Sequence, residues 1–210
     1  MFIERPPRIF RLFFPGCIFR KQQEKKCVYL TFDDGPVPGI TTQVLDILDR
    51  HGIKATFFMV GDNVRKHPAE YQDVVNRGHA VGNHTMHHLQ GIRTTTRKYI
   101  ADVMEARKYI GETSLFRPPH GVLRARQAMS MKKHFRIVMY DLVTRDYSKH
   151  LSVKDIVDNV RKYTRNGSVI VFHDSEKSAP RVIQALEESL IWLENQGYEF
   201  RLIDSELNGR

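Results

Sequence analysis

The chain alternates short apolar runs with amphipathic stretches of helical period, and this alternation restricts the architectures that it can adopt. It predicts parallel strands with helices packed outside them, either as a closed barrel or as an open doubly wound sheet. Seven strands are expected, at residues 28–31, 55–60, 79–81, 115–116, 135–140, 169–172 and 198–203.

Helix boundaries are marked by residues with known positional preferences. Pro68 and Pro180 stand where helices begin, Gly52 and Gly197 stand where helices end, and Ser152 with Asp155 forms a capping box. Six helices are therefore expected between the strands, at residues 41–50, 68–77, 94–110, 122–133, 152–165 and 180–196.

Polar residues follow the predicted strands at several separate points. In a (β/α) barrel these strand ends meet at one rim, where active sites are built, whereas an open sheet brings together only the pair at its switch point. The residues concerned are Asp33, Asp34, His84, His88, Arg117, Asp146 and His173. Their joint chemistry favours a single-domain barrel.

One carboxylate and two imidazoles from this set suit a metal ion. A carboxylate with His84 and His88 forms a facial site with open positions, as metal-assisted hydrolysis requires. The other of the two adjacent acids, Asp33 and Asp34, is then left to act as a base. Alternatively, Asp-Asp-Gly-Pro is an ordinary polar turn and the histidines belong to a solvated loop.

Length and charge limit the other function classes. The 210 residues suffice for one domain with a sizeable core. The net charge of +9 favours anionic partners, but the basic residues are spread along the chain, so no nucleic-acid partner is expected. Cys17 and Cys27 are the only cysteines, which argues against a disulfide framework.

Residues 1–26 are expected to be an amino-terminal extension that packs its aromatic side chains on a catalytic domain at 27–210. Its apolar run at residues 12–19 is broken by Pro15-Gly16 and lacks the continuous core of a secretory signal. A cytoplasmic or membrane-peripheral location is expected, with contact to a membrane surface through this extension as an alternative.

From about Lys25 onward the chain resembles the polysaccharide deacetylase family, the nodulation-type deacetylases of carbohydrate esterase family four. Four motifs carry the resemblance: Thr31-Phe32-Asp33-Asp34-Gly35-Pro36, His84-Thr85-Met86-His87-His88, Arg117-Pro118-Pro119-His120-Gly121 and Val171-Phe172-His173. The resemblance implies a distorted seven-stranded (β/α) barrel that removes acetyl groups from N-acetylated sugars of a glycan. O-acetyl ester hydrolysis, as on xylan, and a catalytically silent glycan-binding barrel are the alternatives.

The resemblance also implies a role for each matched residue. Asp34, His84 and His88 would hold one divalent ion, usually zinc, with cobalt or nickel as substitutes. Asp33 would be the general base and His173 the acid that protonates the departing amine. Arg117 would orient and tune Asp33, and the backbone amide of His120 would help to stabilise the oxyanion.

One segment departs from the family pattern. Residues 140–147 align with an Asp-x-x-Asp-Trp motif, but Val143 stands in place of the first aspartate and Tyr147 in place of the tryptophan. Asp146 remains and is expected to pair with Arg117, whereas the groove wall at Tyr147 should differ. The choice of acetylated glycan or amino-sugar substrate is therefore less constrained than the reaction type.

Overall fold

The computed structural model describes residues 4–21 and 23–203. Its centre is a parallel sheet with strand order β5-β4-β3-β2-β1-β7-β6, and β8 pairs with the first residues of β1 outside this path. The strands are β1 Cys27–Asp33, β2 Thr56–Met59, β3 Ala80–Asn83, β4 Leu115–Phe116, β5 Arg136–Ile137, β6 Leu142–Val143, β7 Ser168–His173 and β8 Glu199–Phe200. The seven-stranded path confirms the predicted barrel-like α/β fold.

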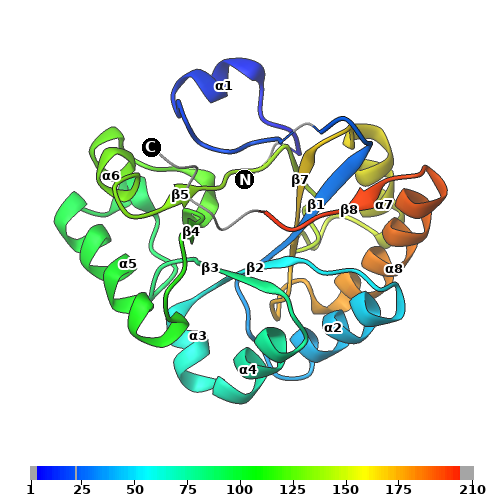
Figure 1. The fold of residues 1–210 in the computed structure, drawn as a ribbon, viewed down its shortest axis with the longest axis horizontal. Helices are drawn as coiled ribbons and strands as arrows, with labels where there is room; N and C mark the ends of the chain where they lie inside the picture. The colour runs from blue at the N-terminus through cyan, green and yellow to red at the C-terminus, as the bar shows by residue number, and fades with distance from the viewer. Residues whose placement is uncertain (1–3, 22, 204–210) are drawn as a thin grey trace.

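Most of the helices surround this sheet, while α1 stands apart at the top of the view (Figure 1). They are α1 Arg8–Leu12, α2 Ile40–Arg50, α3 Gly61–Lys66, α4 Pro68–Asn76, α5 Thr96–Ile110, α6 Ala125–Met131, α7 Val153–Tyr163 and α8 Ala179–Asn195, with short 3₁₀ turns at Gly91–Arg93 and Pro119–Gly121. The expected capping box of Ser152 and Asp155 is present at the start of α7. Helices α2, α7 and α8 cover one side of the sheet with a continuous apolar core.

The register of the central strands places polar residues together at one end. All seven residues of β1 are buried, and β1 runs between β2 and β7. Asp33, the last residue of β1, lies beside His173, the last residue of β7. Because the strands are parallel, the loops that follow them leave the sheet on the same side.

Some predicted elements differ from those observed. Helix α3 and strand β6 were not expected, because each is short and lacks a full period of apolar residues. The expected strand at 135–140 is reduced to Arg136–Ile137. The backbone beyond Ile137 instead forms hydrogen bonds with the amino-terminal segment.

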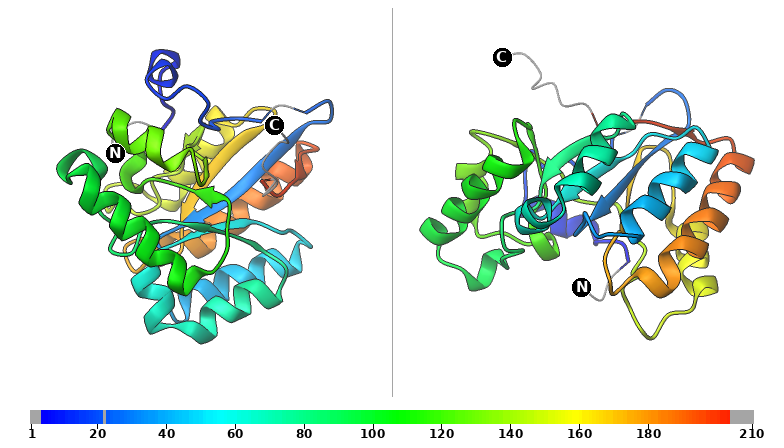
Figure 2. Two further views of the ribbon diagram at one scale, coloured as in Figure 1. Left: turned by 60° about the vertical axis from the view of Figure 1, so that its left-hand side comes forward. Right: turned by 90° about the horizontal axis from the view of Figure 1, so that it is seen from below.

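The amino-terminal segment lies between the edge strand β5 and the start of β7, which is second from the other edge of the sheet. Ile18 N–H donates to Ile137 O at 2.8 Å, and Met139 N–H donates to Ile18 O at 2.7 Å. Farther along, Lys21 N–H donates to Gly167 O at 2.9 Å, just before β7. The left view of Figure 2 shows this blue segment above the strands. The backbone after β5 and the backbone before β7, which are not neighbours in the sheet, are thus joined through the start of the chain.

Aromatic side chains of the same segment are part of the core. Phe14 and Phe19 are buried in a cluster with Phe116, Phe135 and other residues between α5 and α6. Within the described residues, no helix is long and apolar enough to cross a membrane.

Candidate active site

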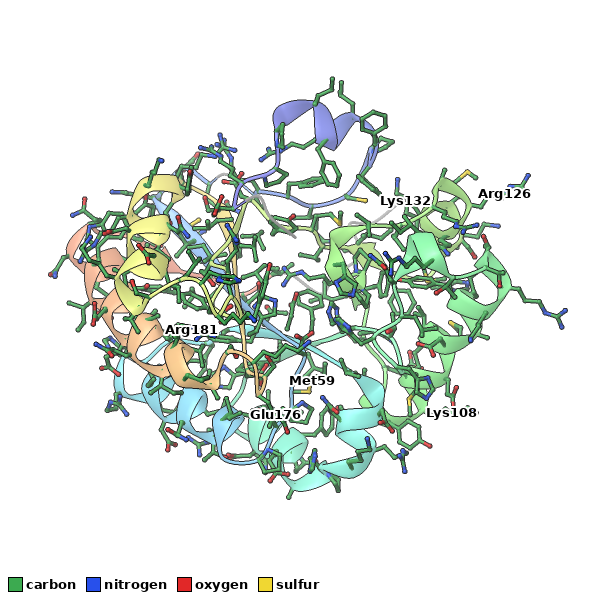
Figure 3. The ribbon with its side chains drawn as sticks, turned by 180° about the vertical axis from the view of Figure 1, so that it is seen from behind. Met59, Lys108, Arg126, Lys132, Glu176 and Arg181 are labelled. Carbon is green, nitrogen blue, oxygen red and sulfur yellow. The ribbon has the colours of Figure 1, made fainter. Side chains whose placement is uncertain are left out.

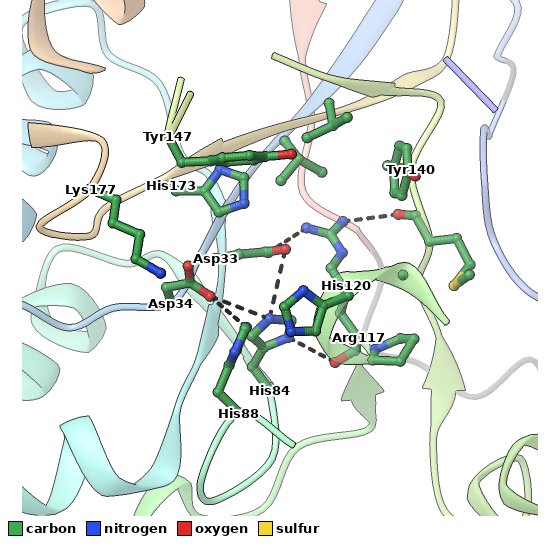
Figure 4. A pocket seen from close by; sticks show the side chains of 15 residues that line it. Asp33, Asp34, His84, His88, Arg117, His120, Tyr140, Tyr147, His173 and Lys177 are labelled. Atoms are coloured by element: carbon green, nitrogen blue, oxygen red, sulfur yellow. Dashed lines mark hydrogen bonds and ion pairs between the residues drawn. The ribbon is translucent and has the colours of Figure 1, made fainter. Parts of the chain in front are cut away.

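The polar residues that follow the strands line one cavity of about 270 Å³ (Figure 4). From the predicted set it includes Asp33, Asp34, His84, His88, Arg117, His120, Tyr147 and His173. Asp146 lies behind the cavity wall, hydrogen-bonded to His173. The sheet therefore brings together residues that are separated by as many as 140 positions, from Asp33 to His173.

Arg117 fixes Asp33 at the base of the cavity. Its guanidinium is buried and donates to Asp33 Oδ1 at 2.6 Å and to Thr31 Oγ1 at 2.8 Å. The backbone carbonyls of Val138 and Met139 accept its remaining hydrogen bonds. One oxygen of Asp33 is thus occupied, while Oδ2 faces His84 Nε2 at 4.0 Å. This arrangement suits a carboxylate that accepts a proton beside a metal site without ligating the metal.

Asp34, His84 and His88 form the metal-type cluster. One ligand atom from each lies within 4.8 Å of the others. Asp34 Oδ1 lies 3.0 Å from His88 Nε2 and 3.6 Å from His84 Nε2. Within the described part of the chain this is the group of acidic, histidine or cysteine side chains whose geometry could hold an ion. A carboxylate with two imidazoles is a donor set that divalent zinc accepts.

The tautomer of His84 fits that use. His84 Nδ1 lies 2.8 Å from the carbonyl oxygen of Arg117, which can only accept, so Nδ1 carries the proton. The Nε2 lone pair then points toward Asp34. Burial lowers the pKa of His84 to about 4, against the opposing charge of Asp33, so the ring is a neutral ligand.

The loop between the two histidines is held by a buried carboxylate that sequence reasoning missed. Asp102 on α5 accepts from the backbone N–H groups of Met86 at 2.8 Å and His87 at 3.1 Å. It also binds His87 Nδ1 at 2.6 Å, and His87 is not part of the metal-type cluster. An aspartate on the apolar face of a predicted helix was the signal available in the sequence.

Electrostatics favours an ionised Asp34. Burial alone would raise the pKa of its carboxyl group, but the hydrogen bond from His88 and the charges of His173 and His88 hold it well below its usual range. Asp34 has a φ of 81°, a left-handed conformation that a non-glycine residue seldom adopts. The same region is occupied by His88 and His120 in the other loops of the cavity. Such conformations are concentrated at functional sites.

The partner of Asp146 differs from the expected one. Asp146 binds His173 twice, through Nδ1 at 2.8 Å and through the backbone N–H at 2.7 Å, and does not pair with Arg117. The guanidinium of Arg117 instead bonds to Asp33 and three other acceptors. Asp146 follows β6, which pairs with β7, and so lies beside His173. Burial favours the neutral form of His173, but the charge and hydrogen bond of Asp146 outweigh it and raise its pKa to about 9.

The other predicted groove residues border the same histidines. The Tyr147 ring stands edge-on to His173, with centroids 4.8 Å apart. The His120 ring lies 4.8 Å from that of His88. Tyr140 and Lys177 also line the cavity and were not predicted as site residues. Tyr140 begins the segment that was aligned with the family, whereas no pattern around Lys177 marked it.

Behind Asp34, a close approach requires glycine at position 35. Asp174 accepts from Gly35 N–H at 3.1 Å and from Thr41 Oγ1 at 2.7 Å. A Cβ atom on Gly35 would lie 2.0 Å from Asp174 Oδ2. The Asp-Asp-Gly-Pro sequence is therefore a loop fixed by a buried carboxylate rather than an ordinary solvated turn.

Comparison with known proteins agrees with this geometry. The model of the polysaccharide deacetylase family matches residues 20–135. A peptidoglycan-N-acetylglucosamine deacetylase of Bacillus cereus is 34% identical over 183 residues, which cover 84% of this chain and 85% of the relative. The chain belongs to the polysaccharide deacetylase family. Its predicted class, a hydrolase that removes acetyl groups from N-acetylated glycans, is confirmed by these relatives.

Further relatives extend the same likeness. The chain is 32% identical to the deacetylase PgdA of Listeria monocytogenes over 90% of its own length but only 40% of that protein. A crystal structure of the Bc1960 peptidoglycan N-acetylglucosamine deacetylase in complex with a naphthyl hydroxamate superposes with a TM-score of 0.83 at 30% identity, covering 94% of this chain and 95% of that one. The Xyl-CE4 domain of a multidomain xylanase gives a TM-score of 0.74 at 29% identity, covering 86% of this chain and 88% of that one.

Proposed function

We propose that this protein hydrolyses the N-acetyl group of N-acetylglucosamine residues in a polymeric glycan, with one zinc ion at Asp34, His84 and His88. The relatives named for peptidoglycan support the sugar, and the donor set supports the ion. Cobalt and nickel are the expected substitutes. When bound, the ion supplies Lewis acidity toward the acetyl carbonyl and makes a water molecule more acidic.

The position of Asp33 is the observation that carries this proposal. One oxygen of Asp33 is anchored by Arg117 at 2.6 Å, and the other faces the ligand cluster 4.0 Å from His84 Nε2. Asp33 therefore takes the proton of the attacking water, while Arg117 keeps the carboxylate oriented. The backbone N–H of His120 stabilises the developing oxyanion.

His173 completes the reaction from the neighbouring strand. With a pKa raised to about 9 by Asp146 against the opposing effect of burial, it is protonated at neutral pH. It can then protonate the departing amine as the C–N bond breaks. Tyr147 packs on the same ring and keeps it facing the cavity.

A comparison of N- and O-acetyl substrates tests this function. We expect acetate release from the N-acetylglucosamine tetramer with zinc, its loss with a chelator, and much slower release from acetylated xylan. Faster hydrolysis of the xylan esters would overturn the N-acetyl assignment. Zinc-independent release would overturn the role of the ion.

We also propose that α1 contacts an anionic membrane surface. Ile9, Leu12 and Phe13 share one face and are 64%, 77% and 74% exposed. Figure 3 shows α1 projecting from the molecule on the side of Lys132, whose Nζ donates to Pro15 O. Exposed apolar residues on a helix of a basic protein suit the boundary of an anionic bilayer.

Vesicle sedimentation tests the membrane contact. Binding to phosphatidylglycerol vesicles should exceed binding to phosphatidylcholine vesicles and fall in the Leu12→Ser, Phe13→Ser variant. Ile191→Ser, at a position 47% exposed on α8, is the matched control. If both variants bind as the parent does, α1 is not the contact.

A further inference from the structure

A second cavity, also of about 270 Å³, adjoins the active-site cavity. His120 and Tyr140 line both cavities and so form the boundary between them. The remaining walls come from the amino-terminal segment and from the loops after β3 and β4: Pro6, Pro7, Phe10, Gln90, Ile92 and Val122. The two cavities are therefore neighbours that share the walls formed by His120 and Tyr140.

The amino-terminal wall is held in place by defined contacts. Val143 N–H, in β6, donates to Glu4 O at 2.8 Å, and Arg145 binds the Glu4 carboxylate at 2.5 Å. Arg11 binds the buried Asp141 at 2.5 Å, which fixes α1 on its other side. Residues 6–10 thus span two anchored points, and the wall exists before any ligand arrives. Such preorganisation reduces the ordering cost of binding.

The chemistry of the lining selects among ligands. Two prolines, a phenylalanine, an isoleucine and a valine offer apolar surface, and no acidic or basic side chain other than the His120 ring lines this cavity among the described residues. Gln90 supplies a carboxamide that can both donate and accept. Apolar walls with a few polar groups suit a pyranose ring, which presents C–H faces and uncharged hydroxyl groups.

The sizes of the cavities point the same way. Small-molecule sites commonly measure about 300–1,000 Å³. Each cavity alone, at about 270 Å³, falls below that range, and the two together fall within it. The combined space is therefore large enough for a ligand longer than one acetylated sugar. His120 lies at the junction, in contact with the ring of His88 on the active-site side.

We propose that the second cavity binds the sugar next to the one being deacetylated, so that the amino-terminal segment confers a preference for oligomeric glycans. This subsite rests on the proposed function, because it extends the substrate path of that site. Ile92 and Phe10 are the residues whose change should alter it. Neither belongs to the catalytic machinery.

Binding and turnover with sugars of two lengths test the subsite. In Ile92→Trp the larger side chain fills the cavity from a position that is 49% exposed, so the fold should tolerate it. The variant should bind the N-acetylglucosamine tetramer roughly three- to tenfold more weakly, as expected for the loss of one stacked ring. Its affinity for the monomer should not change. The KM for the tetramer should rise while its kcat stays constant.

The control is Ile191→Trp, at a comparably exposed position on α8. Phe10→Ala removes part of the wall instead of filling the cavity, and Phe13→Ala, at the exposed residue just after α1, is its control. Calorimetric binding with a chelator present gives the dissociation constants without turnover. The proposed function fails if acetate is not released. The subsite is overturned if the parent binds tetramer and monomer equally, or if Ile92→Trp affects both sugars alike.

Discussion

His173 depends on its contact with Asp146, and this dependence gives a pH prediction. Burial disfavours the imidazolium, but the charge and hydrogen bond of Asp146 raise the pKa of His173 to about 9. Since the protonated ring is the proposed acid, activity should fall as the pH rises through this pKa. In Asp146→Asn the charge is lost, the pKa falls, and the alkaline limb of kcat/KM should move down by roughly one unit or more.

The control for this prediction is Asp158→Asn, on the exposed face of α7. That variant should leave the pH profile of kcat/KM unchanged. An alkaline limb that stays in place in Asp146→Asn would show that His173 is not the acid, or that Asp146 does not set its protonation.

At this scale the sequence predicted the side chains that the structure brings to one cavity, but not all of the residues that support them. The motifs predicted Asp33, Asp34, His84, His88, Arg117 and His173, and the structure brings them to one cavity. The predicted partner of Asp146 was wrong, because the sequence does not reveal that Arg117 bonds to Asp33, Thr31 and backbone carbonyls. Asp102 and Asp174 act through buried hydrogen bonds that need three-dimensional neighbours to be recognised.

At the scale of elements, His79, just before β3, makes the stability of the fold depend on pH. Its Nδ1 accepts from Ala55 N–H at 3.1 Å, and Nε2 has no partner among the described residues. Burial lowers the pKa of His79 to about 4, below the unfolded value near 6.5. The unfolded chain therefore binds a proton first as the pH falls, and the free energy of unfolding decreases between pH 6.5 and 4.

The contribution of this one group is about 3 kcal/mol over that interval. In His79→Gln the proton-binding side chain is gone, so the free energy of unfolding should change less between the two pH values, by about 3 kcal/mol. Urea unfolding of the parent and the variant at pH 7 and at pH 4.5, always with a chelator present, measures this difference. His84, whose pKa is also lowered by burial, contributes equally to both proteins. Identical pH slopes would contradict the assignment.

Elements with strong local signals were predictable, whereas two short ones, α3 and β6, were not. Helix α7 was expected from its capping box, and Pro180 marked the first turn of α8. Helix α3 has six residues and β6 has two, so neither spans a repeat that sequence periodicity can detect. They are stabilised by tertiary contacts, such as the pairing of β6 with β7.

At the scale of the whole molecule, the amino-terminal segment is part of the barrel's core packing. Phe19 is 4% exposed, whereas Phe13 is 74% exposed. Phe19→Ala should lower the free energy of unfolding by about 3–5 kcal/mol, as expected for a buried aromatic residue. Phe13→Ala should change it by about 0.5 kcal/mol or less. Chemical denaturation compares the two, and equal effects would mean that the segment packs only loosely.

The alternation of elements predicted parallel strands with outer helices, and the polar residues after several strands favoured a barrel over an open sheet. The way in which the segment at Ile18 joins Ile137 and Met139 did not follow, because a stretch of extended chain has no period of its own. The boundary expected after residue 26 stays a prediction, and the Phe19 measurement bears on it.

Acetate release by Asp33→Asn, measured beside its zinc content, tests the account most directly. The variant keeps Asp34, His84 and His88, so it should take up one zinc ion per chain as the parent does. With its base removed, it should hydrolyse the N-acetylglucosamine tetramer about 10²–10⁴-fold more slowly. Near-parental turnover by a zinc-loaded Asp33→Asn protein would contradict the mechanism.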